Sequence, residues 1–292
     1  MYLYVNGEYK KQDELHISPF DHGFLYGIGA FETLRTYNGH PFLLYDHIDR
    51  LNAAVRELGI DFSLSYSEAE QIIKRLLELN HLNNAYIRIN VSAGAEELGL
   101  SAAPYKNPVL IFFIKELNLP ERLTKQGVIL SVRRNTPEGS FRIKSHHFLN
   151  NVLAKREIGD HPKTEGIFLT HSGYVAEGIV SNIFWVKNNT VYTPAVSTGI
   201  LNGITRQFVL TILEKHRIPY EEGLYPLDHL LSAQEAFITN SLQEIVPITH
   251  IGQTAFAGEQ GILTNRLITI YKKVRQHILT RSEFEVGDEQ WV

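Results

Sequence analysis

Lys144 stands where the sequence best suits nucleophilic chemistry. It follows an apolar, β-branched run at residues 128–132, which predicts a buried strand, and a loop at residues 134–140. Ser145 has the side chain of a good N-cap, and the helix expected after it has an apolar stripe formed by Leu149, Val152 and Leu153. An amine just ahead of a helix N-terminus feels a partial positive charge, which favours the neutral form that attacks a carbonyl carbon. The pattern makes Lys144 a candidate nucleophile, with a solvated surface lysine as the alternative.

Three other polar side chains have a place in the predicted elements. Arg50 falls on a predicted helix at residues 46–59, and Arg88 falls on a predicted strand at residues 84–94. Thr205 begins a predicted helix. Considered alone, they have ordinary interpretations, respectively an exposed helix arginine, a salt-bridged strand arginine and a simple helix cap.

Composition limits the class of protein. The chain has 292 residues, 43% hydrophobic and 21% charged, which is typical of a globular protein that can bury a substantial core. A net charge of −4 without charge runs indicates neither a nucleic-acid partner nor a membrane surface. The sequence has no cysteine, no membrane span and no signal peptide, so we predict a cytoplasmic protein.

Strands and helices are mixed along the chain without regular βαβ alternation, which predicts an α+β (mixed α/β) protein. Besides the helix after Lys144, helices are expected at residues 46–59, with Asp46 as N-cap, and at 67–80, 205–216 and 264–279. Strands are expected at residues 2–5, 8–10, 30–37, 41–44, 84–94, 109–115, 127–132, 167–170, 180–186, 191–193 and 235–239. A proline-containing linker at residues 116–121 predicts a small N-terminal domain at 1–118 and a larger C-terminal domain at 119–292.

Two local patterns resemble functional motifs without satisfying them. Gly27 and Gly29 lack the third glycine of a nucleotide loop and lead into a strand, so they predict either a tight turn or close approach of a ligand. His146 and His147 are adjacent and cannot both face one metal ion from a helix. We predict no metal site.

Five motifs in order give the chain a resemblance to a known family. They are Phe31-Glu32, His47-Ile48-Asp49-Arg50, Ile143-Lys144-Ser145, Glu177-Gly178 with Ser181-Asn182, and Gly199-Ile200-Leu201 with Gly203-Ile204-Thr205-Arg206. The whole chain resembles the class IV pyridoxal-phosphate enzymes, which include branched-chain aminotransferases, D-amino-acid aminotransferases and aminodeoxychorismate lyases. The resemblance implies the two-domain fold type IV of pyridoxal-phosphate enzymes, like D-amino-acid aminotransferase, with the cofactor between the domains, and a homodimer.

The resemblance also implies roles for particular residues. Lys144 would bind pyridoxal 5'-phosphate covalently and later act as a base, and Glu177 would face the ring nitrogen. The remaining cofactor-binding residues would be Arg50, Leu201, Ile204, Thr205, Asn240 and Ser241. Leu201 would pack on the ring, and the others would hold the phosphate.

Within the family, residues 18–27 and 133–142, followed by Lys144-Ser145-His146-His147, resemble the bacterial lyases most. This implies elimination of pyruvate from 4-amino-4-deoxychorismate to give 4-aminobenzoate for folate biosynthesis. Thr33 would be the proton donor, and Phe31, Arg88 and Asn240 would contact the substrate. Thr33 as an ordinary strand residue is the alternative.

Two other functions remain open on the same sequence. One is a branched-chain or D-amino-acid aminotransferase, although residues 92–98 lack the arginine that traps the substrate carboxylate in D-amino-acid aminotransferases. The other is a protein that binds the cofactor without catalysis, which the presence of Lys144 disfavours.

Overall fold

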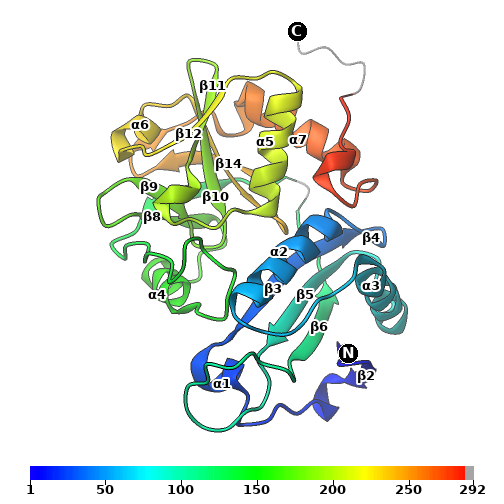
Figure 1. The fold of residues 1–292 in the computed structure, drawn as a ribbon. Coiled ribbons are helices and arrows are strands. Elements are labelled where there is room, and N and C mark those ends of the chain that lie inside the picture. The colour runs from blue at the N-terminus through cyan, green and yellow to red at the C-terminus, as the bar shows by residue number, and fades with distance from the viewer. Residues whose placement is uncertain (121, 287–292) are drawn as a thin grey trace. The chain divides into compact units, whose positions relative to one another are not determined.

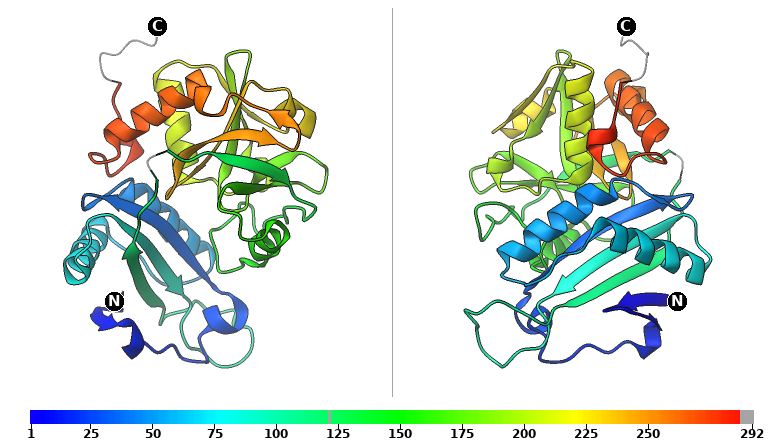
Figure 2. Two further views of the ribbon diagram at one scale, coloured as in Figure 1. Left: turned by 180° about the vertical axis from the view of Figure 1, so that it is seen from behind. Right: turned by 45° about the vertical axis from the view of Figure 1, so that its right-hand side comes forward.

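The computed structural model describes residues 1–120 and 122–286, which form two compact units (Figures 1 and 2). Unit 1 consists of Met1–Asn118, Ile143–His147 and Arg275–Glu283. Among the described residues, unit 2 consists of Leu119–Arg142, Phe148–Val274 and the three residues from Phe284 to Val286. The sequence predicted a single division at residue 118. In the structure, two short segments from later in the chain also belong to unit 1. Glu121 of the predicted linker and residues 287–292 lie outside the described residues.

Unit 1 is a twisted sheet with two helices on one face. The strand order is β2-β1-β6-β5-β3-β4, and α2 and α3 pack on the sheet (Figure 1). The elements are β1 (Tyr2–Val5), β2 (Glu8–Lys11), α1 (His22–Tyr26), β3 (Gly29–Tyr37), β4 (His40–Pro41), α2 (Leu44–Glu57), α3 (Tyr66–Asn80), β5 (Ala85–Ser92) and β6 (Val109–Glu116).

The sheet of unit 1 is amphipathic because successive strand residues point to opposite faces. Its buried face carries Leu34, Ile87 and Ile89, which pack on α2 through side chains such as Ile48 and Leu51. Burying each such side chain stabilises the fold by about 1.5–3 kcal/mol. The same alternation places Phe31, Thr33 and Arg88 on the opposite face, which is only partly covered.

Unit 2 is built on a longer sheet with the strand order β12-β11-β10-β13-β14-β7-β8-β9. The short strand β15 also pairs with β14. Helix α5 packs on β12 and β13, α7 packs on β13 and β14, and α4 packs on β8 (Figure 2). The elements are β7 (Lys125–Ile129), α4 (Leu149–Ile158), β8 (Thr164–Leu169), β9 (Val175–Gly178), β10 (Asn182–Lys187), β11 (Thr190–Pro194), α5 (Ile204–Lys215), β12 (Tyr220–Gly223), α6 (Leu227–Leu231), β13 (Glu235–Asn240), β14 (Glu244–Ile251), β15 (Thr254–Ala255) and α7 (Ile262–Val274).

Two predicted details at the start of α2 are wrong. The strand expected at residues 41–44 ends at Pro41, and α2 begins at Leu44 after the left-handed Leu43, so Asp46 is not its N-cap. The Asp46 carboxylate instead accepts hydrogen bonds from the backbone N–H and the guanidinium of Arg281. It thus ties a C-terminal segment to unit 1.

The helix predicted after Lys144 is confirmed, but its predicted N-cap is wrong. Helix α4 begins at Leu149, and the residue before it is Phe148, which makes no capping bond, so Ser145 is not an N-cap. The stripe of Leu149, Val152 and Leu153 is exposed, whereas Asn151 and Ala154 are buried. Polar contacts explain this orientation, because Asn151 donates to the carbonyl of Ile179 and accepts from Arg134 at 3.4 Å.

Candidate functional site

The segment that contains Lys144 is held by strand-like pairing at one end of β3. Phe31 N–H donates to the Lys144 carbonyl at 2.9 Å, and His146 N–H donates to the Gly29 carbonyl at 3.0 Å. Lys144 is therefore positioned by the edge of a sheet, and the predicted helix N-terminus does not begin until Leu149. Its Nζ lies 4.6 Å from the centroid of the Phe31 ring.

The glycine pair before β3 makes room for two histidine rings. A Cβ at Gly29 would lie 2.2 Å from Cε1 of His146, and a Cβ at Gly27 would lie 2.5 Å from Cδ2 of His147. Gly27 also has a φ of 73°, which disfavours a side chain. The glycines therefore accommodate the segment of Lys144 itself, and this function of the pair was not predicted.

Arg88 lies on the same partly covered face as Lys144. Thr33 faces Arg88 across β3 and β5, and Phe31 faces Asn90. The Arg88 guanidinium carbon lies 3.7 Å from the Phe31 ring centroid, and its Nη2 donates to Asn90 Oδ1 at 3.1 Å. Burial lowers the pKa of Arg88. Within the described residues Arg88 has no carboxylate partner, so this half-buried cation is suited to a ligand anion.

Arg50 reaches a buried carboxylate between β3 and α2. Its Nε and Nη2 donate to the two oxygens of Glu32 at 2.6 and 2.7 Å, and His47 Nδ1 lies 2.7 Å from Glu32 Oε2. Burial opposes ionisation of Glu32, but the charge and hydrogen bonds of Arg50, together with His47, outweigh it and lower the pKa to about 2. Arg50 is thus an oriented cation with a side chain 18% exposed.

In unit 2, Glu177 is buried and accepts several hydrogen bonds. Arg134 Nε donates to its Oε1 at 2.8 Å. Leu201 N–H donates to Oε2 at 3.0 Å, and Asn182 Nδ2 lies 3.4 Å from the same oxygen. The carboxylate therefore fixes the loop that leads into α5, and Arg134 supplies the compensating charge.

The start of α5 has the features of a phosphate site. Its N-cap, Gly203, makes no side-chain cap, so the first N–H groups at Ile204 and Thr205 have no side-chain acceptor there. A Cβ at Gly203 would lie 2.1 Å from Asn182 Oδ1, which explains the glycine. Thr239 pairs with Asn182 across β13 and β10, and its buried hydroxyl has no hydrogen-bond partner among the residues that the structure describes. A buried orphan hydroxyl of this kind calls for a ligand or a water.

Asn240 and Ser241 form the turn that follows β13. Asn240 Oδ1 accepts from the N–H groups of Leu242 and Gln243 at 3.0 and 2.7 Å. The amide side chain of Asn240 thus stabilises the turn that presents Ser241. A direct substrate contact would need an atom other than this oxygen.

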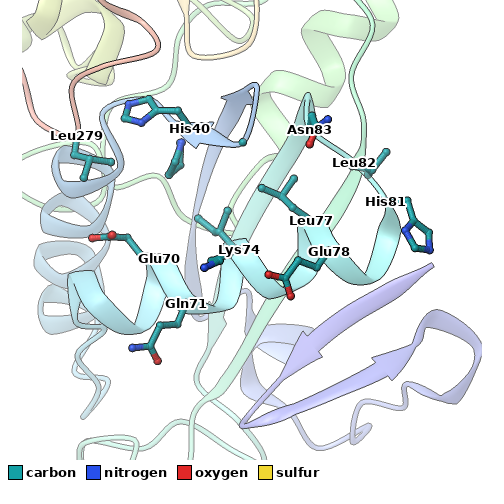
Figure 3. Close-up of a pocket in the computed structure, with 13 residues that line it drawn as sticks. His40, Glu70, Gln71, Lys74, Leu77, Glu78, His81, Leu82, Asn83 and Leu279 are labelled. Carbon is teal, nitrogen blue, oxygen red and sulfur yellow. The ribbon is translucent and has the colours of Figure 1, made fainter.

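The lining of the pocket in Figure 3 includes none of the predicted site residues. The pocket has a volume of about 800 Å³ and is lined mainly by α3, including Glu70, Lys74 and Leu77, with His40 and Leu279 (Figure 3). In the described part of the chain, no group of three or more His, Asp or Glu side chains is arranged to hold a metal ion. None of the helices at residues 1–120 or 122–286 has the length and apolar content of a membrane span.

Six residues that contact the predicted ones directly, or in the case of His47 through Glu32, were not predicted as site residues. Arg134 and Glu32 were missed because an isolated charge in a sequence does not reveal its partner. Asn90 and His146 were missed because strand register, which sequence does not specify well, brings them together. The others are His47 and Asn182, which lie within the quoted motifs.

Comparison with known proteins identifies similar chains. Residues 29–251 match the family described as amino-transferase class IV. The aminodeoxychorismate lyase of Bacillus subtilis (strain 168) is 47% identical over 293 residues, which is 99% of this chain and 98% of that protein.

Solved structures are similar over nearly the whole chain. A putative 4-amino-4-deoxychorismate lyase from Legionella pneumophila is 26% identical with a TM-score of 0.83, covering 90% of this chain and 96% of that one. A branched-chain amino acid aminotransferase from T.th., complexed with N-(5'-phosphopyridoxyl)-L-glutamate, is 26% identical with a TM-score of 0.85, covering 94% of each chain. The predicted fold type is confirmed.

Proposed function

The chain is a member of the class IV aminotransferase family, and we propose that it acts there as a pyridoxal-phosphate-dependent 4-amino-4-deoxychorismate lyase. One observation carries the proposal. The amine of Lys144 and the guanidinium of Arg88 both lie against the ring of Phe31, on the sheet face that also carries Thr33. In the proposed function these three groups would act as a nucleophile, an anion-binding group and a proton donor.

The residues present fit the cofactor. Unit 1 offers the Lys144 amine and the positive charge of the Arg50 guanidinium, which Glu32 orients through its Nε and Nη2 atoms. Unit 2 offers the N–H groups at Ile204 and Thr205, the turn at Ser241 and the orphan hydroxyl of Thr239. Glu177 would face the ring nitrogen and Leu201 the ring. When bound, pyridoxal 5'-phosphate supplies an electron sink for the pair left when a proton is removed from the substrate.

The chain's own residues would carry the remaining steps. Arg88 would bind a carboxylate of the substrate, which carries two. The Lys144 amine would remove the proton from the ring carbon that bears the substrate nitrogen. The ether C–O bond then breaks, and the Thr33 hydroxyl would protonate the departing enolpyruvate, which becomes pyruvate. The six-membered ring becomes aromatic, which makes the loss favourable and releases 4-aminobenzoate.

An aminotransferase for branched-chain or D-amino acids is the second candidate, because a similar scaffold belongs to the T.th. branched-chain amino acid aminotransferase. The residues at 92–98 offer no arginine for the carboxylate of a D-amino acid. The two functions differ in whether a keto-acid acceptor is needed. Elimination needs none, since no amino group is transferred.

One experiment separates the candidates. The holoenzyme is incubated with 4-amino-4-deoxychorismate, and 4-aminobenzoate and pyruvate are measured with and without a keto acid. We expect equal amounts of both products without any acceptor. A requirement for the acceptor, or turnover of amino acids alone, would contradict the lyase. A cofactor absorbance band that no amine changes would instead support binding without catalysis.

Lys144 is tested separately from the reaction. Borohydride reduction followed by peptide mass mapping should place the cofactor on the peptide that contains Lys144, and Lys144→Ala should lose this label and all turnover. Lys155→Ala, which removes an exposed lysine from α4, is the matched control. Label on another lysine would reject the assignment.

We also propose a homodimer. Exposed apolar side chains support it: Phe20 and Phe24 near α1, Leu98 and Leu100 in a neighbouring loop, and the stripe of Leu149, Val152 and Leu153 on α4. The two loops of unit 1 are joined by the bond from Glu96 N–H to the Phe20 carbonyl. Sedimentation of the wild type should give a dimer, which Phe24→Asp should weaken. A monomeric wild type would contradict this proposal. The cytoplasmic location remains a prediction.

A further inference from the structure

We propose that His146, acting through Asn90, is a positioning residue that orients the Arg88 guanidinium toward a carboxylate on the ring of the substrate. The inference rests on the proposed function, because it concerns the selectivity of the same site. It assigns a role to a histidine that the sequence had offered only as half of an adjacent pair.

A single oxygen joins the two side chains. Asn90 Oδ1 accepts from Arg88 Nη2 at 3.1 Å and lies 3.0 Å from His146 Nε2. Since an amide oxygen only accepts, this contact requires the hydrogen of a neutral imidazole to be on Nε2. The same contact fixes which end of the Asn90 amide faces Arg88. The amide N–H₂ group is then available to donate beside the guanidinium.

The His146 ring is held on several sides. Its ring stacks on Phe31 with the centroids 6.4 Å apart and the planes at 28°, and its backbone N–H donates to the Gly29 carbonyl. Gly29 leaves no space for a Cβ against the ring. A donor held in this way can impose its geometry on Asn90, because it cannot easily turn away.

The charges around His146 favour a neutral ring. Burial and the positive charge of Arg88 lower its pKa to about 4, and His147 acts in the same direction, while Asp21 opposes it. Across the neutral pH range the imidazole therefore donates a hydrogen bond without adding a second cation beside Arg88. It orients the guanidinium without competing for the anion.

The N–H groups of Arg88 that do not contact Asn90 indicate which kind of ligand the site suits. Arg88 uses Nη2 on Asn90, its guanidinium carbon lies 3.7 Å from the Phe31 ring centroid, and the Tyr86 side chain is a further polar neighbour. The guanidinium has five N–H groups, so those beyond these contacts can meet the two oxygens of a carboxylate. Phe31 offers an apolar surface next to this cation. The Arg88 cation and the Phe31 ring together suit a carboxylate attached directly to a six-membered ring. The substrate keeps this ring and this carboxylate when it becomes 4-aminobenzoate.

The test uses 4-aminobenzoate as the probe on the holoenzyme, with its Kd measured by calorimetry. His146→Phe keeps a stacked ring and removes the donor, whereas His146→Gln keeps a donor. We expect His146→Phe to raise the Kd for the probe and the KM about tenfold, the typical effect of losing one hydrogen bond to this cluster, with kcat changed less than threefold. His146→Gln should restore most of the affinity. His147→Phe is the matched control, and cofactor content should stay unchanged in all three.

A double-mutant cycle distinguishes action through Arg88 from a merely structural role. In an Arg88→Met background, His146→Phe should have no further effect on the Kd for 4-aminobenzoate. The ratio of wild-type to His146→Phe KM should also be constant from pH 6 to 9, because the imidazole does not titrate there.

The failures are distinguishable. If the protein shows lyase turnover and His146→Phe has the Kd and KM of the wild type, this inference is overturned and the proposed function stands. Equal losses from His146→Phe in both backgrounds, or losses explained by cofactor release, would also overturn it. If there is no lyase turnover but the double-mutant cycle gives the expected Kd values for 4-aminobenzoate, the lyase is rejected. The positioning of Arg88 by His146 then still stands.

Discussion

Arg50 and Glu32 form a two-point ion pair across α2 and β3, with N–O distances of 2.6 and 2.7 Å. The carboxylate side chain is 1% exposed, and the arginine is 18% exposed. The planar fork is therefore held in one orientation before any ligand arrives. Lysine could not be held in this way, because its ammonium is a point charge.

The first prediction concerns cofactor retention. Arg50→Ala should weaken binding of pyridoxal phosphate by roughly tenfold to a hundredfold, since it removes a charge-assisted contact to the phosphate. Arg50→Lys should recover only part of the affinity, because Glu32 cannot hold a lysine ammonium in one orientation through two hydrogen bonds. The measurement is cofactor content after dialysis and a Kd by absorbance titration. Arg56→Ala, an exposed arginine on the same helix, is the control. Unchanged retention in Arg50→Ala would remove Arg50 from the phosphate site.

The second prediction concerns stability in acid. The pKa of Glu32 is about 2 in the folded chain, against an ordinary value of 4.5. The unfolded chain therefore binds more protons between these values, and the stabilisation present above pH 4.5 is lost as the pH falls toward 2. Between pH 5 and 2 the wild type should lose about 3 kcal/mol more unfolding free energy than Glu32→Gln.

Urea unfolding of the apoprotein across this pH range measures the difference. Glu57→Gln, at an exposed position on α2, should retain the wild-type slope. A Glu32→Gln variant with the same acid slope as the wild type would show that Glu32 is not the titrating group.

Local chemistry predicted the turns and strands of this fold well. The strands predicted at residues 2–5 and 8–10 pair through Asn6-Gly7, and both turn residues have the positive φ values that a type I′ turn requires. Strands β3 and β5 were predicted from their β-rich patterns, and both are confirmed. These features depend on residues close together in the chain.

Features that depend on distant partners were not predicted. Helix α4 turns Asn151 inward, where it meets Arg134 and Ile179, and its apolar stripe is left exposed, which the spacing of residues did not reveal. Strand β14 was missed, although it is buried between β13 and β7. The Arg134–Glu177 pair likewise joins residues 43 positions apart, which no local pattern reveals.

The third prediction concerns this buried pair. Both side chains are about 5% exposed, so removing one partner leaves an uncompensated buried charge. Arg134→Met should lower the unfolding free energy of the apoprotein by about 3–5 kcal/mol, and Arg134→Met with Glu177→Gln should recover part of the loss. Denaturant unfolding measures both. Arg133→Met, at the neighbouring position, is the control. A loss no greater than the control's would show that the pair does not stabilise unit 2.

The fourth prediction concerns Thr33, which faces Arg88 across β3 and β5 and shares its sheet face with Phe31. If its hydroxyl protonates the departing enolpyruvate, Thr33→Val should lower lyase kcat by about a hundredfold or more, because general acid catalysis contributes about 10²–10⁴. Thr33→Ser keeps the hydroxyl and should stay within about tenfold of the wild type. Binding of 4-aminobenzoate and cofactor content should change little in either variant, since valine preserves the β-branched shape. Pyruvate formation by the holoenzyme measures the rate. Full activity in Thr33→Val would assign the proton to another donor, and equal losses in both variants would point to packing in β3 as the cause.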